Sequence, residues 1–129
     1  MTELKSKILL MVPHLTLRKA VRKLLEHMGP KSIVETEDGS QGLKLIQSAQ
    51  ISRTPFDLII STEEIVTASL RLFKNQALVI IATTQDSTNT CDLEKHILAR
   101  DLPHAIHLFM PFQHKELELA IEMALEKAA

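Results

Sequence analysis

Residues 8–28 read ILLMVPHLTLRKAVRKLLEHM, and this stretch combines two different periodicities. Ile8 to Val12 is a continuous apolar run, which is typical of a β-strand buried on both faces of a parallel sheet. From Leu15 to Met28 the apolar residues recur every three to four positions, which predicts an amphipathic helix. Gly29 and Pro30 end that helix. The stretch therefore predicts the first strand and the first helix of an α/β protein.

The same alternation continues to the end of the chain. Further strands are predicted at about Ser32–Thr36, Phe56–Ile60, Leu78–Ala82 and Ile106–Phe109. Helices are predicted after the turn Asp38-Gly39-Ser40, at about Leu93–Arg100 and at about Lys115–Lys127. Five strands alternating with helices predict a parallel sheet with helices on both faces. We expect a single domain of residues 1–129, with any ligand beyond the carboxyl ends of the strands.

The composition limits the classes of partner. A formal net charge of −1 gives no field that attracts nucleic acid, and four Phe without Trp or Tyr give no platform for stacking bases. The longest apolar runs are too short to span a bilayer. Cys91 is the only cysteine, which excludes an internal disulfide and indicates a reducing, cytoplasmic location. We therefore expect neither nucleic acid nor a membrane as a partner.

Four segments carry a resemblance to a known family: Lys7–Val12 with Arg18 behind it, Asp57–Ile60, Leu78–Thr83 and Phe109–Phe112. In order and spacing they resemble the receiver domains of response regulators, the CheY-like domains of two-component signalling, over nearly the whole chain. The resemblance implies a flavodoxin-like (βα)5 three-layer sandwich with the strand order 2-1-3-4-5. It also implies a cis peptide bond between Met110 and Pro111.

Receiver domains depend on five side chains for their phosphorylation chemistry. Two acids hold Mg²⁺, an Asp accepts the phosphoryl group, and a Thr or Ser and a Lys grip the phosphate. The resemblance places these functions on Val12, Pro13, Thr62, Thr83 and Met110, of which only Thr83 has the residue type of the family. The chain therefore resembles a degenerate pseudo-receiver. No cofactor, no metal and no enzymatic activity are expected.

Two segment lengths also differ from the family pattern. The segment from Thr62 to Thr83 is shorter, so the helix between the third and fourth strands is expected to be short or distorted. The segment from Thr83 to Met110 is longer, which adds chain around the fourth helix.

Several polar residues at the predicted rim of the sheet allow two interpretations. Glu63, Glu64, His14 and Asp86 are residue types that bind divalent metals, but their spacing matches no metal motif, so a solvated polar rim is favoured. Thr62 is a conceivable target of a Ser/Thr kinase. A small hydroxyl that fills the space of the family's Asp is the favoured interpretation.

The first and last helices carry opposite charges. The basic residues are Arg18, Lys19, Arg22 and Lys23, and the acidic residues are Glu116, Glu118, Glu122 and Glu126. Because the receiver fold places these two helices side by side, we expect ion pairs between them, each contributing about 0–1 kcal/mol.

Leu119 and Met123 point away from the apolar stripe of the last helix, among charged residues. Either they form a contact surface, or they are two isolated exposed apolar side chains. In receivers the face made by the fourth helix, the fifth strand and the fifth helix is the usual surface for dimerisation or partner docking. His107 occupies the position of the family's aromatic switch residue. The resemblance thus implies protein partners of a signalling pathway, with a homodimer through this face among them.

Together these features predict a phosphorylation-independent pseudo-receiver that acts as a protein–protein interaction module in a two-component-type system. The alternative is a small-molecule or nucleotide sensor that uses the altered pocket, which Val12, Pro13 and Met110 make more apolar. The loop Pro13–Leu17 contains no glycine that would let backbone amides approach a phosphate, so a flavin-binding function is disfavoured.

Overall fold

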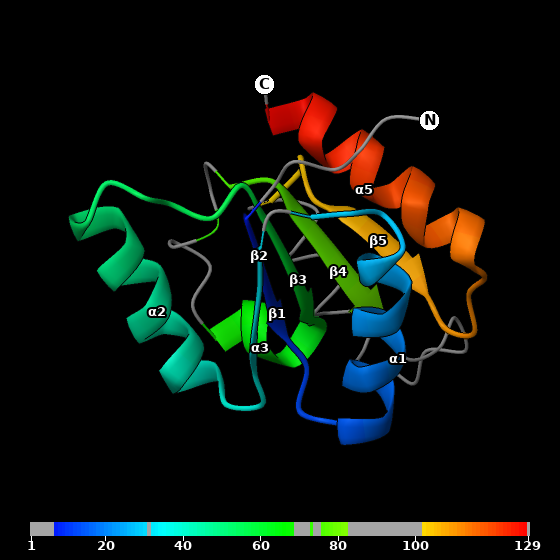
Figure 1. The fold of residues 1–129 in the computed structure, drawn as a ribbon, viewed down its shortest axis with the longest axis horizontal. Coiled ribbons are helices and arrows are strands. Elements are labelled where there is room, and N and C mark those ends of the chain that lie inside the picture. The colour runs from blue at the N-terminus through cyan, green and yellow to red at the C-terminus, as the bar shows by residue number, and fades with distance from the viewer. Residues whose placement is uncertain (1–6, 31, 69–72, 74–75, 83–101, 129) are drawn as a thin grey trace. The chain divides into compact units, whose positions relative to one another are not determined.

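The computed structural model describes residues 7–30, 32–68, 73, 76–82 and 102–128. The elements in chain order are β1 (Lys7–Met11), α1 (Leu15–Glu26), β2 (Ser32–Thr36), α2 (Gly39–Ile51), β3 (Leu58–Thr62), α3 (Glu63–Ala68), β4 (Leu78–Ala82), β5 (Ile106–Phe109) and α5 (His114–Ala128). The five parallel strands have the order β2-β1-β3-β4-β5 (Figure 1). The predicted flavodoxin-like fold class and strand order are confirmed. The helix predicted at Leu93–Arg100 lies outside the described residues.

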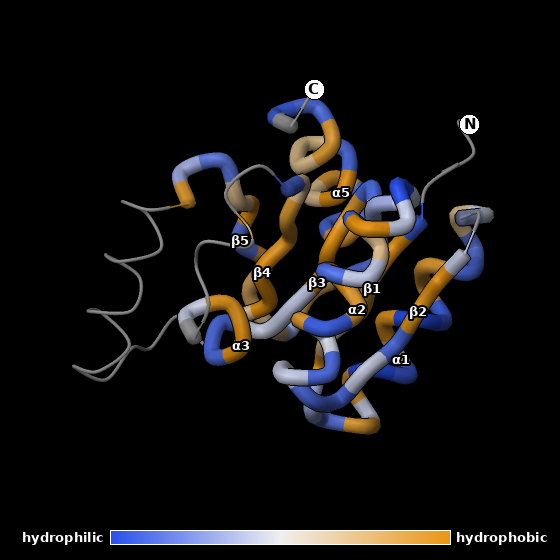
Figure 2. Tube along the Cα trace, turned by 90° about the vertical axis from the view of Figure 1, so that its left-hand side faces the viewer, coloured by the Kyte–Doolittle hydropathy of each residue, from blue (hydrophilic) through white to orange (hydrophobic). Residues whose placement is uncertain are grey.

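The strands follow from runs of buried aliphatic side chains. All residues of β3 and β4 are buried, as a strand covered on both faces requires. Figure 2 shows hydrophobic colour along β4, whereas hydrophobic and hydrophilic residues alternate along α5. β3 begins two residues later than predicted, because Asp57 does not continue the strand. The Asp57 backbone N–H donates to the Lys7 carbonyl at 2.8 Å, and the Asp57 carboxylate accepts from the Lys7 backbone N–H at 2.8 Å.

The chain divides into two compact units, residues 1–60 and 61–129. In the first unit β1 pairs with β2 in parallel, and α1 and α2 lie on opposite sides of these two strands (Figure 1). The alternation of side chains along β2 explains this arrangement. Glu35 forms ion pairs with α1, whereas its neighbour Thr36 contacts Gln41 of α2. The sequence prediction of a single domain, residues 1–129, stays a prediction.

In the second unit β4 pairs with β5 in parallel, and α5 packs on both strands. The side of α5 that faces the strands is apolar and buried, with Leu117, Ala120, Ile121 and Ala124. α3 is described over six residues, Glu63–Ala68, and the prediction of a short or distorted helix after the third strand stays a prediction, because residues 69–72 lie outside the described ranges. Within the described ranges, no helix is long and apolar enough to cross a membrane.

His104 connects two parts of the second unit. Its Nε2 lies 2.9 Å from the carbonyl oxygen of Phe73 and 2.9 Å from that of Gln76. Because both oxygens are acceptors, Nε2 carries the proton and donates to them. The imidazole thus ties the segment before β5 to the segment before β4.

Gly42 allows α2 to approach β1 and β2 closely. A Cβ atom at this position would overlap the Met11 sulfur and would lie 3.3 Å from Thr36 Cγ2. Met11 is fully buried, so its side chain would have to shift within the core to make room for that atom. The distance between α2 and the strands is therefore set by the absence of a side chain at residue 42.

We expect Gly42→Ala to destabilise the protein by about 1 kcal/mol. The gain in helix propensity of about 1 kcal/mol is outweighed by an overpacking cost of about 1–3 kcal/mol. Urea denaturation followed by circular dichroism measures the difference. Gln47→Ala, at an exposed position of the same helix, is the control and should change stability by less than about 0.5 kcal/mol. A Gly42→Ala variant more stable than the wild type would contradict the close approach.

Candidate functional site

The end of β1 is built from Val12 and Pro13. Val12 is fully buried, and its two backbone polar groups are both used. Its N–H donates to the Thr36 carbonyl at 3.2 Å, and its carbonyl accepts from Arg18 Nη1 at 2.8 Å. Pro13 is half-buried and has no N–H. Neither side chain carries an oxygen, so Val12 and Pro13 offer no side-chain ligand for Mg²⁺.

Arg18 holds this corner in place from α1. Its side chain is 12% exposed, and its Nε lies 3.4 Å from Glu35 Oε1 while its Nη1 lies 3.9 Å from Glu37 Oε2. Arg22, one turn further along, pairs with the other carboxylate oxygen of Glu35 and lies 3.8 Å from Glu26. Arg18 and Arg22 pair with carboxylates of the first unit, and the expectation that they pair with acidic residues of the last helix stays a prediction. Their carboxylate partners are on β2, on the residue after it, and on α1 itself.

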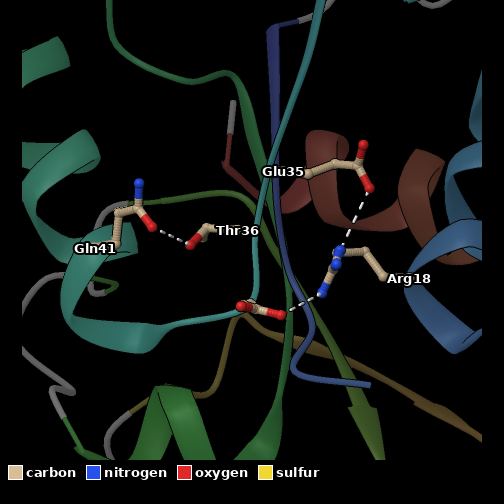
Figure 3. Close-up of a pocket in the computed structure, with 5 residues that line it drawn as sticks. Arg18, Glu35, Thr36 and Gln41 are labelled. Atoms are coloured by element: carbon tan, nitrogen blue, oxygen red, sulfur yellow. Dashed lines mark hydrogen bonds and ion pairs between the residues drawn. The ribbon is translucent and has the colours of Figure 1, made fainter. Parts of the chain in front are cut away.

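A polar cavity of about 260 Å³ lies beside this network, lined by Arg18, Glu35, Thr36, Glu37 and Gln41 (Figure 3). The Thr36 hydroxyl lies 3.3 Å from Gln41 Oε1 and 3.2 Å from the Asp38 carbonyl oxygen, and it accepts from the Asp38 N–H at 3.2 Å. Most polar groups of the cavity wall thus hydrogen-bond or ion-pair with one another. Sequence reasoning missed this cavity, although Arg18 belongs to a segment that carried the resemblance.

β3 ends at Thr62, which the resemblance predicts to be at the position of the family's phosphate acceptor. The residue is 3% exposed, and its hydroxyl has no hydrogen-bond partner among the described residues. The carbonyl of Thr62 accepts from the Ser61 hydroxyl at 3.2 Å. A buried hydroxyl is a poor substrate for a kinase, which agrees with the interpretation that Thr62 fills space. Whether Thr62 is modified stays a prediction.

β5 leads into Met110 and Pro111. The Met110 N–H donates to the Ala82 carbonyl at 2.9 Å, and the peptide bond between Met110 and Pro111 is cis, as the resemblance implied. Met110 is half-buried, and its thioether carries no charge that could stabilise a phosphoryl group. His107 is half-buried on β5. Thr83, Asp86 and Cys91 lie outside the described residues.

Metal binding has no geometric support in the part of the chain that the structure describes. There, no three His, Cys, Asp or Glu side chains lie close enough together to hold an ion. His14 is exposed and caps α1 without a side-chain hydrogen bond, and Glu64 is exposed in the first turn of α3.

The outer side of α5 exposes two large apolar side chains, as the sequence predicted. Leu119 is 57% exposed and Met123 is 40% exposed, and they lie one helical turn apart. Glu116, Glu122 and Glu126 are exposed on the same helix. A contact surface is thus available, and its use by a partner stays a prediction.

No family model and no curated protein sequence matches the chain. Solved structures do match it. The receiver domain of an HD domain-containing protein from Pseudomonas fluorescens Pf-5 gives a TM-score of 0.73 at 18% identity, over 99% of this chain and 92% of that chain. A response regulator receiver protein from Burkholderia phymatum gives a TM-score of 0.72 at 18% identity, over 95% of this chain and 96% of that chain. The chain has the receiver fold.

A third match shows how this fold is used within a larger protein. NtrX from Brucella abortus, in complex with ATP, gives a TM-score of 0.71 at 19% identity. The match covers 97% of this chain and 27% of NtrX. The chain thus spans about a quarter of NtrX, and at such identities the likeness establishes the fold.

In this receiver fold the predicted site residues are distributed over both units. Val12 and Pro13 follow β1 in the first unit. In the second unit, Thr62 is the last residue of β3, and Met110 comes directly after β5. The assignment of these residues to the family's functional positions stays a prediction. Valine, proline and methionine would there replace two acids and a lysine.

We expect Thr62→Val to stabilise the protein by about 1 kcal/mol. Valine has nearly the same shape, and it removes a buried hydroxyl that has no hydrogen-bond partner among the described residues. Urea denaturation measures the change. Thr67→Val is the matched control, because the Thr67 hydroxyl donates to the Glu63 carbonyl at 2.7 Å. This variant should not gain stability, and a loss in Thr62→Val as large as in Thr67→Val would show that the Thr62 hydroxyl is bonded.

Proposed function

We propose that the chain is a phosphorylation-independent pseudo-receiver that acts as a protein–protein interaction module in two-component-type signalling. The observation that carries the proposal is the end of β1, where Val12 and Pro13 stand in place of an acid pair. Mg²⁺ prefers oxygen ligands at near-octahedral positions. The backbone carbonyl of Val12, the one oxygen that this residue offers, accepts from the Arg18 guanidinium at 2.8 Å.

Two further positions support the same conclusion. Phosphoryl transfer to a receiver requires a carboxylate nucleophile, and the Thr62 hydroxyl would need a base to become one. The transferred group also requires a positive charge, and Met110 supplies none. Without metal, nucleophile and cation, the fold has no catalytic step to perform. We therefore propose a non-enzymatic function.

The interaction surface of this proposal is the outer face of α5, with His107 on the neighbouring β5. Leu119 and Met123 give it an apolar centre, and acidic residues surround them. Such a polar rim around an apolar centre is typical of protein–protein contacts. We propose a second copy of the chain or another signalling protein as the partner at this face.

No observation on the described residues favours the alternative function, a small-molecule or nucleotide sensor in the altered pocket. The NtrX structure contains ATP, but this chain spans 27% of that protein, so the nucleotide gives no support here. A thermal-shift titration with nucleotides would test the alternative, since a specific ligand raises Tm with concentration.

The first expected outcome concerns Mg²⁺ and beryllofluoride, a mimic of the phosphoryl group. In an NMR titration of the 129-residue chain, the amide peaks of Val12, Thr62 and Met110 should not move in a saturable way. The combined variant V12D/P13D/T62D/M110K is the gain-of-binding control, and it should acquire Mg²⁺-dependent shifts at these positions. Saturable shifts in the wild-type chain would overturn phosphorylation independence.

The second expected outcome concerns self-association. Sedimentation velocity at rising protein concentration should show a rising average sedimentation coefficient for the wild type and a constant one for L119K/M123K. Ile51→Lys is the matched control, because Ile51 is an apolar side chain on another helix and is 84% exposed. It should behave as the wild type. A wild type that stays monomeric would exclude a second copy as the partner.

A further inference from the structure

A second cavity, of about 230 Å³, lies in the first unit. Residues near the amino ends of two strands contribute to it, with Lys7 at the start of β1 and Phe56 just before β3. The remaining wall comes from Val34 of β2, from the C-terminal half of α2, and from Ser52 and Thr54 in the segment after that helix. Ligands of open parallel sheets usually bind beyond the carboxyl ends of the strands. This cavity lies near the amino ends, so it is distinct from the phosphorylation pocket of receiver domains.

One part of the cavity wall is apolar. Phe56 and Ala49 are buried, and Val34 and Leu45 are half-buried and line the cavity. Half-buried aliphatic side chains at a cavity still contact solvent, so a ligand that covers them removes apolar surface from water. The cavity is smaller than the ~300–1,000 Å³ of drug-sized sites, which limits the ligand to a short chain or a single ring.

The other part of the wall is polar and carries a fixed cation. Ser48, Ser52 and Thr54 line it together with Lys7. Lys7 Nζ donates to the Thr54 carbonyl at 2.8 Å and lies 4.6 Å from the centroid of the Phe56 ring. These two contacts hold the ammonium group at the cavity wall. An ammonium has three N–H donors, and this hydrogen bond to Thr54 uses one of them.

The charges around the cavity favour an anion. Lys7 is the charged residue among those that line the cavity. The nearby acid, Asp57, does not line it and already accepts from the Lys7 backbone N–H at 2.8 Å. The C-terminal end of α2 carries a partial negative charge, but its last carbonyls accept from the backbone N–H groups that follow the helix. The charge of the cavity wall itself is therefore positive.

We propose that this cavity binds a small amphipathic carboxylate. Its aliphatic or aromatic body lies against Phe56, Val34 and Leu45, and its carboxylate accepts from Lys7 and the neighbouring hydroxyl groups. This inference does not depend on the proposed pseudo-receiver function.

The test is an NMR titration of the full 129-residue chain with hexanoate, 1-hexanol and acetate as three separate probes. Hexanoate should produce saturable shifts at Lys7, Leu45, Ala49 and Phe56. Binding of 1-hexanol should be about tenfold weaker, the factor expected for the loss of one hydrogen bond to a charged group. Acetate should not saturate. Equal affinity for hexanoate and 1-hexanol, or shifts outside the cavity wall, would overturn the proposal.

Variants distinguish the contribution of the Lys7 charge to hexanoate binding from the contribution of the space in the cavity. Ser48→Phe places a ring at an exposed position of the wall and should abolish hexanoate binding without affecting the fold. Lys7→Met keeps the aliphatic stem but removes the charge, and should weaken binding about tenfold. Lys19→Met, at an exposed position of α1, is the control and should bind as the wild type does. Hexanoate binding by Ser48→Phe at wild-type affinity would contradict the site even if Lys7→Met fails to fold.

Discussion

The Arg18 guanidinium is the group on which the first unit depends most. It reaches from α1 to the carbonyl at the end of β1 and to carboxylates on and just after β2. A buried carbonyl without a partner costs about 1–3 kcal/mol, and a buried guanidinium without a carboxylate costs more. This one side chain therefore satisfies a backbone group and orders a helix against two strands. In a receiver with acids after β1, metal ligation would take place at the same corner. Here a permanent cation occupies the neighbourhood instead.

Much of the fold could be predicted from the sequence, because the strands are short runs of buried aliphatic residues. The range of β4 follows directly from such a run, and the ranges predicted for the less buried strands β2 and β5 also match the structure. The start of β3 did not, since Asp57 lies next to an apolar run and its bond to the Lys7 backbone can be seen only in three dimensions. The partners of Arg18 and Arg22 were missed for a similar reason. The alternation along β2 directs Glu35 towards α1, and the family arrangement of helices suggested a different partner.

For the candidate site, the features that could not be predicted from the sequence are of a different kind. The proposal that Val12, Pro13 and Met110 do not perform the family's chemistry rests on residue type, so it could be made from the sequence without coordinates. Burial of the Thr62 hydroxyl and the use of both Val12 backbone groups required the structure. Cavities are harder still to predict, because their walls combine residues that are distant along the chain. Lys7, Val34 and Phe56 share one cavity, yet no local pattern relates them.

The His104 hydrogen bonds bear on how the second unit is held together at the amino ends of two strands. One ring N–H, shared by the Phe73 and Gln76 carbonyls, serves two backbone acceptors. β4 and β5 pair through backbone hydrogen bonds along their length, whereas this side chain joins the segments that lead into them. Replacing the ring by a side chain without an N–H would remove that link and leave the pairing of the two strands themselves unchanged.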